Sequence, residues 1–298
     1  MGFWAALLLA PATVTRAATP PSPAPPPVQD QLDLQARSDV LQGSGARAFG
    51  MGGAFLARAD DATAASWNPA GLSYLREPEI SGVFTGAGLT SHQVFPCVQP
   101  CQGTPEVDQR RGSTPDFFAA AYPFEWGSLS GAGQLSFQRV VSFSNHRTFT
   151  NIAGATFNVR SSGGFDVLAL GTGVQAGHRL RLGATLNHWF NGYSQNVDKQ
   201  SPVRAESIQT TDFNLSGWNA NGGLIFNPWE SLNVGVVVKT PFWGSVDLRQ
   251  ARTDGPVTQP TTNSSPKAGD MLGPVSLHFP GAVGLGLSWR PRSALTLS

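Results

Sequence analysis

Apolar and polar residues alternate along most of the chain after Glu77. The stretch from Leu232 to Lys239 places an apolar residue at every second position, and the same period recurs over 180–187 and 282–289. Alternation over this length predicts β-strands whose two faces meet different surroundings. The pattern predicts a ninth strand starting at Ala294 and eight complete strands, at 78–90, 114–124, 128–143, 163–176, 179–193, 212–226, 231–245 and 274–290.

The connections between these strands alternate in length. The long ones cover 91–113, 144–162, 194–211 and 246–273, and the short ones 125–127, 177–178, 227–230 and 291–293. Outer-membrane β-barrels have short periplasmic turns and long outer loops. Aromatic residues such as Trp126, Trp229 and Trp289 stand near strand ends, where such barrels carry their interface girdles. The sequence therefore predicts an all-β fold, a transmembrane antiparallel β-barrel; the alternative is a soluble β-sandwich.

The composition narrows the class of protein. Only 13% of the 298 residues are charged, against about a quarter in soluble domains, and the mean hydropathy is −0.12. The chain has no apolar run of about 18 residues, the length that a transmembrane helix needs. Its 34 Gly, 18 Phe and 8 Trp suit strands with one face in lipid and one in a polar lumen. The net charge of +1 without basic runs argues against nucleic-acid binding.

The N-terminal region predicts three parts before the barrel. Residues 1–17 resemble an export signal, because a short apolar stretch precedes a small-residue cleavage site. Residues 18–40 are rich in proline and predict an extended linker. Residues 41–76 predict a compact domain of small residues with short helical pieces, and residues 77–298 form the barrel part.

The compact domain has recognisable local signals. Glycines between Gly43 and Gly53 permit tight turns. Asp60 or Asp61 can cap a short helix, and proline after Asn68 ends it. We expect Asn68 to hydrogen-bond the local backbone and Pro69 to stiffen the turn.

Three pieces of this domain carry a resemblance to a known family. They are Gly45–Ala54, Ala59–Ala64 and Trp67–Leu72, and in this order they resemble the FadL/TodX family of outer-membrane transporters. The resemblance implies that residues 41–76 form a hatch inside the barrel, with Asn68, Pro69, Ala70 and Gly71 as hatch or gating residues. A purely structural role for these residues is the alternative.

A hatch inside the barrel has a consequence for the number of strands that the barrel needs. An eight-stranded barrel is filled by its own side chains and has no room for a plug. The family has fourteen strands, so we expect the chain to be an N-terminal fragment with about eight of fourteen.

The family function would be passive transport of long-chain fatty acids or other hydrophobic compounds, including aromatic hydrocarbons. The resemblance implies a site in the outer membrane of a Gram-negative bacterium, with outer-membrane lipid and lipopolysaccharide as further partners. It also implies a kink in the third strand, for which Gly131 and Gly133 are candidates; the alternative is that glycines are simply frequent in these barrels. The alternative function is that of a non-transport barrel, an accessory protein of secretion machinery.

Catalytic and cofactor signatures are missing from the sequence. The chain has no nucleophile elbow, zinc-protease motif or phosphate-binding loop, and its five histidines are scattered, so we expect neither an enzyme nor a metal or cofactor. Cys97 and Cys101 predict a loop disulfide in an exported chain. A metal site with His92 and two free thiols are the alternatives.

Overall fold

A computed structural model describes residues 43–93, 106–150, 156–200, 206–255, 272–292 and 295–298. The chain divides into two compact units, Met1–Ser38 and Asp39–Ser298, and all described residues belong to the second. The predicted export signal (1–17), the predicted linker (18–40) and the cysteines Cys97 and Cys101 lie outside the described residues.

The described part is mostly β-strand, which confirms the all-β prediction. Every strand pairing is antiparallel, as in a sheet built from successive hairpins. The strands are β1 (Glu79–Gln93), β2 (Glu106–Trp126), β3 (Leu129–Ser142), β4 (Asn145–Thr150), β5 (Thr156–Ala176), β6 (Leu180–Phe190), β7 (Gly192–Gln200), β8 (Glu206–Trp229), β9 (Leu232–Lys239), β10 (Phe242–Gly255), β11 (Leu272–Phe279), β12 (Ala282–Arg292) and β13 (Leu295–Leu297).

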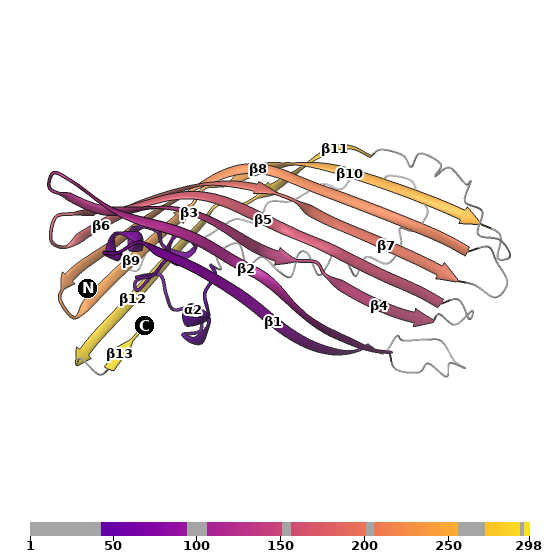
Figure 1. Cartoon of the computed structure of the whole chain (residues 1–298), viewed down its shortest axis with the longest axis horizontal. Helices are drawn as coiled ribbons and strands as arrows, with labels where there is room; N and C mark the ends of the chain where they lie inside the picture. The colour runs from indigo at the N-terminus through magenta and orange to yellow at the C-terminus, as the bar shows by residue number, and fades with distance from the viewer. Residues whose placement is uncertain (1–42, 94–105, 151–155, 201–205, 256–271, 293–294) are drawn as a thin grey trace, which may run out of the picture. The chain divides into compact units, whose positions relative to one another are not determined.

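The strands form one continuous sheet (Figure 1). Along the strands we divide it into a first level near the short turns and a second level near the long connections. The first level has the order β1-β2-β3-β5-β6-β8-β9-β12-β13, and β4, β7, β10 and β11 pair beyond it. β5 and β8 run through both levels, whereas their neighbours are interrupted and resume as β4, β7 and β10.

Local chemistry explains where the strands break. Asn191, between β6 and β7, has a left-handed φ of 72°, which asparagine tolerates better than most residues. Pro241 precedes β10 and Pro280 precedes β12, and neither can donate a ladder hydrogen bond.

Each predicted strand overlaps an observed one, but the observed strands extend further into the long connections. β2 begins at Glu106 rather than 114, β5 at Thr156 rather than 163, and β8 at Glu206 rather than 212. The added stretches of β2 and β8 have one apolar residue each and show no apolar alternation in the sequence, whereas that of β5 has Phe157 and Val159 at alternate positions. At the opposite end of the strands the turns are tight. Gly127 and Gly177 adopt positive φ values of 61° and 81° in two of these turns.

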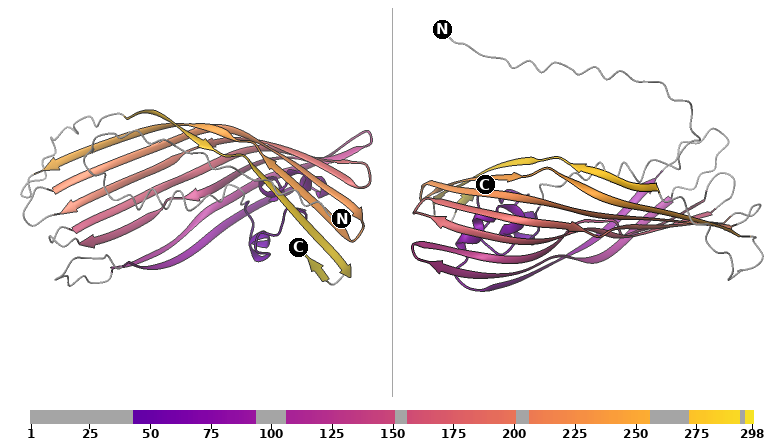
Figure 2. Two further views of the ribbon diagram at one scale, coloured as in Figure 1. Left: turned by 180° about the vertical axis from the view of Figure 1, so that it is seen from behind. Right: turned by 90° about the horizontal axis from the view of Figure 1, so that it is seen from above.

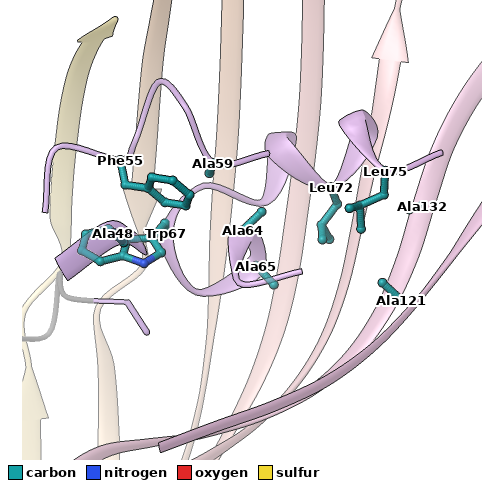
Figure 3. Close-up of a cluster of buried hydrophobic side chains, with 10 residues drawn as sticks. All are labelled: Ala48, Phe55, Ala59, Ala64, Ala65, Trp67, Leu72, Leu75, Ala121 and Ala132. Carbon is teal, nitrogen blue, oxygen red and sulfur yellow. The ribbon is translucent and has the colours of Figure 1, made fainter. Parts of the chain in front are cut away.

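Residues 43–76, which we call the N-terminal segment, lie against the concave face of the sheet (Figure 2). They contain α2 (Ala46–Gly50), α3 (Ala64–Trp67) and the 3-10 helix η2 (Pro69–Tyr74). Their apolar side chains join strand residues Ala121 and Ala132 in one buried cluster (Figure 3). A single apolar core therefore connects the segment with the sheet.

Within the described residues, no helix has the length and apolar character that crossing a bilayer requires.

Candidate functional site

The side chain of Asn68 connects the N-terminal segment to two strands. Asn68 is fully buried, and its Nδ2 donates hydrogen bonds to the carbonyls of Leu56 (2.8 Å) and Leu224 (3.1 Å). Its Oδ1 accepts from the Ala70 N–H at 3.1 Å and caps η2, which is the local hydrogen bond expected from the sequence. The third acceptor in reach is the Val236 carbonyl of β9, at 3.5 Å.

The predicted group Asn68, Pro69, Ala70 and Gly71 is buried as one unit. Gly71 is required by a close approach within the segment, because a Cβ there would lie 1.7 Å from the Ala59 carbonyl oxygen. The structure thus places these residues together against the sheet; their gating role stays a prediction.

A row of glycines on three neighbouring strands forms the seat for η2. Gly173 of β5 pairs with Gly183 of β6, which pairs with Gly223 of β8. A Cβ on Gly173 would lie 2.5 Å from the Pro69 oxygen, and one on Gly183 would lie 2.2 Å from the Pro69 carbonyl carbon. Since these contacts are with backbone, only glycine permits them. The sequence shows the glycines but not their shared row, which depends on strand register.

A second seat lies on β9 and β12. Gly235 and Gly286 are register partners, and a Cβ on either would come within 2.5 to 2.9 Å of Leu56. Asn233 donates to the Ala57 carbonyl at 3.2 Å beside this seat. The N-terminal segment is therefore held at two separate places on the sheet.

Further side chains of the sheet donate to carbonyls of the segment. Gln134 Nε2 donates to the Ala62 oxygen at 2.6 Å, and Arg181 donates to the Ser73 oxygen at 3.1 Å. The Arg181 guanidinium also lies 3.8 Å from the centre of the Tyr74 ring. These bonds satisfy buried backbone acceptors that a helix of one or two turns cannot satisfy itself.

A pocket lies between α3 and the sheet. It holds about 480 Å³ of empty space including open solvent, and its enclosed part is close to the size of one water molecule. Its lining from the sheet mixes apolar residues, Val140, Val167, Ala169 and Trp189, with polar ones, Ser136, Gln138, Asn187, Asn219, Asn221 and Lys239.

The polar lining of the pocket includes an ordered chain of amides. Asn219 Oδ1 accepts from Asn187 Nδ2 at 3.1 Å and from Trp189 Nε1 at 2.8 Å. Asn219 Nδ2 donates to Asn221 Oδ1 at 3.3 Å. Lys239 completes this set, with only 8% of its surface exposed. The amides and Lys239 thus form a continuous polar row along β6, β8 and β9 at the pocket.

An aromatic cluster continues from Trp189 toward the second level of the sheet. Trp189 lies 5.2 Å from Phe242 and 5.5 Å from Phe279, and these two rings stack at 4.5 Å. Phe165 lies 6.4 Å from Phe279 and 5.0 Å from Phe143. The cluster gives the concave face an apolar layer next to the pocket.

The opposite, convex face of the sheet is apolar and exposed. A row of rings crosses it from β1 to β8, with centroids 4.4 to 6.5 Å apart, through Phe84, Phe118, Phe137, Phe190, His188 and Trp218. Nearer the tight turns, exposed leucines such as Leu135, Leu170 and Leu285 follow. A second set of exposed aromatic residues stands at the turns and includes Tyr122, Trp126 and Trp229.

Charged side chains lie immediately beyond the row of rings on the convex face. Arg139 and Asp166 are register partners and form a bidentate ion pair at 2.8 and 2.9 Å. Asn191 Nδ2 also donates to Asp166 at 2.6 Å. Along the strands, the apolar residues of the convex face are thus followed by an ion pair at the next pair of register partners on that face.

The pairing of β2 with β3 ends at Phe117 and Gln138. Beyond this pair β2 has a bulge at Asp116 next to Pro115, which has no N–H, and β3 shifts register between Arg139 and Val141. In the described ranges, residues 106–116 pair only with β1.

The candidate kink residues Gly131 and Gly133 lie elsewhere in β3. The register of β3 with β2 and β5 is continuous through both. Gly131 permits close approach of β5, since a Cβ would lie 2.2 Å from the Gly173 oxygen, whereas a Cβ on Gly133 would meet open space. The irregular part of the third strand is therefore at Val140, a position that the sequence did not indicate.

The part of the chain that the structure describes contains no group of three or more His, Cys, Asp and Glu side chains placed to hold a metal ion. Comparison of the chain with protein-family models, with curated proteins and with solved structures finds no match in any of the three.

Proposed function

We propose that the curved sheet is part of the wall of an outer-membrane β-barrel of the FadL/TodX type. In this proposal the N-terminal segment is the hatch of the barrel. The barrel lets hydrophobic molecules, such as long-chain fatty acids or aromatic hydrocarbons, cross passively. Both edge strands, β1 and β13, must then be paired, because an unpaired strand edge in lipid is costly.

The convex face is the observation that supports a membrane position. Its apolar band lies between the row of rings and the aromatic residues at the turns. From Phe118 to Trp126, and from Trp218 to Trp229, strands tilted by about 40° rise roughly 20 to 29 Å at about 3.4 Å per residue. The apolar band of outer-membrane barrels is about 25 Å tall. A soluble sheet would cover such a face.

The concave face supports a path for an amphiphilic molecule. The aromatic cluster offers an apolar surface, and the pocket continues it with amides and Lys239. Because the enclosed part of the pocket is small, passage requires the N-terminal segment to shift. A lateral exit would use the place where β2 and β3 lose their pairing, rather than Gly131 and Gly133.

One observation favours the accessory-protein alternative. The N-terminal segment is closely seated on glycines and bound by side chains from β3, β6 and β9. Such a seal suits a barrel that does not transport. Solute flux separates the two functions.

The test is uptake of a labelled long-chain fatty acid or alkane into liposomes that contain the full-length protein. We expect the protein to accelerate uptake and Trp189→Ala to reduce the acceleration, because the indole joins the aromatic cluster to the amides. Arg160→Gln, on an exposed position of β5, is the control and should match the unmodified protein. Uptake no faster than in protein-free liposomes would overturn the transport proposal and favour the accessory role.

A further inference from the structure

The N-terminal segment consists of a fixed half and a part built around α2. The fixed half is η2, which is seated on Gly173, Gly183 and Gly223 and bound by Arg181. The other part, residues 45–53, is here called the flap. It contains α2 and the turn that follows it.

Each end of the flap has a contact with the sheet and glycines with unusual backbone. On one side Ser44 hydrogen-bonds the Asp116 carboxylate of β2, and Gly45 has a φ of 120°. On the other side Leu56 lies on the second glycine seat, and Gly52 and Gly53 have φ values of 65° and 81°. Glycine passes through such conformations at little cost, so both ends can act as hinges.

Between these ends, α2 interacts within the N-terminal segment. The ring contacts, hydrogen bonds and ion pairs of residues 46–50 in the described structure all have partners inside the segment. Phe49 meets the Trp67 ring edge-on at 6.4 Å while 43% of Phe49 stays exposed. Within the flap Ala48 is fully buried and Met51 packs against the same cluster, so apolar packing and the contacts of Arg47 together hold the flap in place.

Arg47 forms the polar connection between the flap and the rest of the segment. Its Nη1 lies 2.5 Å from Asp60 Oδ1 and 3.5 Å from Asp61 Oδ2, and its Nη2 lies 3.4 Å from Asp60 Oδ2. Its guanidinium also lies 5.3 Å from the centre of the Phe55 ring. The hydrogen bond to Asp60 raises the pKa of Arg47, so the cation persists at every physiological pH.

We propose that Arg47 is a positioning residue that latches the flap over Trp67, and that release of the Asp60 and Asp61 carboxylates lets the flap lift while η2 stays seated. The role of this latch in transport rests on the proposed function. Trp67 belongs to the same short helix as Ser66, which lines the pocket, so a lifted flap exposes Trp67 on the helix that borders the pocket. The side chains of the latch are partly exposed, so salt weakens it.

Hydrogen–deuterium exchange of the purified full-length protein tests the latch without any ligand. Arg47→Gln should speed exchange of the flap by about two- to fivefold, and exchange of η2 should not change. The charge swap Arg47→Asp with Asp60→Arg should restore slow exchange. Arg76→Gln is the matched control, because Arg76 forms an exposed hydrogen bond with Gln175 of β5 and its loss should leave the flap unchanged.

Added salt should speed flap exchange in the unmodified protein and have no such effect in Arg47→Gln, which gives a second readout if a variant folds poorly. The proposal is overturned if flap and η2 change together, or if neither the substitution nor salt changes flap exchange. Liposome uptake is measured separately. A flap that responds as expected in a protein that does not accelerate uptake would overturn the transport proposal and leave the latch standing.

Discussion

The Asn68 side chain donates a 3.1 Å hydrogen bond to the carbonyl of Leu224, a residue 156 positions further along the chain. The same amide nitrogen donates to the Leu56 carbonyl, so a single side chain joins two distant parts of the N-terminal segment to β8. Asn68→Ala leaves these buried carbonyls without the donor, which costs about 1–3 kcal/mol. We expect thermal unfolding of the variant to show this loss.

The control for this prediction is Asn196→Ala. Asn196 accepts a hydrogen bond from Thr210 at an exposed position, where water replaces the lost partner. Equal unfolding temperatures for the Asn68 and Asn196 variants would contradict a structural role for the buried amide.

Gly183→Ala should displace η2. The new methyl group would lie 2.2 Å from the Pro69 carbonyl carbon, and backbone cannot move aside as a flexible side chain can. Overpacking of this kind costs about 1–3 kcal/mol or more. Limited proteolysis within residues 43–76 should become faster. Gly133→Ala is the matched control, because a Cβ there meets open space, and it should behave as the unmodified protein.

The ion pair of Arg139 and Asp166 should show strong coupling in a double-mutant cycle. Asp166 is 2% exposed, so Asp166→Asn leaves the guanidinium without its bidentate partner and also weakens the bond from Asn191. We expect a coupling energy of about 1–3 kcal/mol between Asp166→Asn and Arg139→Gln in chemical unfolding. Additive effects of the two substitutions would show that the pair contributes no coupling.

The substitution Leu170→Lys distinguishes a sheet that faces lipid from a soluble sheet. Leu170 is 64% exposed on the convex face. In a bilayer, Leu170→Lys should destabilise the folded protein by about 2–4 kcal/mol, whereas on a soluble surface it would be tolerated. The measurement is folding into lipid vesicles under denaturant. Ser162→Lys, beyond the row of rings on the same strand, should have little effect.

Strand positions could be predicted where one face is apolar. The predicted strand 128–143 agrees closely with β3 (Leu129–Ser142), whereas the predicted strands 231–245 and 274–290 each span two observed strands, β9 with β10 and β11 with β12. The added stretches of β2 and β8 could not be predicted, since each has a single apolar residue and alternation of side chains then leaves no trace in hydropathy. In β5 the alternation of Phe157 and Val159 is too short to extend the predicted strand.

The site was only partly predictable. Asn68 and Pro69 stand out because helix termination and capping are local properties. The glycine seat and the amide chain from Asn187 to Asn221 depend on which residues of neighbouring strands share a row. Register arises from all the pairings of the sheet together, so single-strand patterns do not reveal it.

The glycine seat has a consequence for how this chain can change. Most packing contacts can be exchanged, because a larger residue on one side is balanced by a smaller one on the other. At Gly173 and Gly183 the nearest opposing atoms belong to the main chain of Pro69, which has no smaller form. No substitution in the N-terminal segment can therefore compensate for a side chain there, and these two positions accept variation only if the segment itself leaves the sheet.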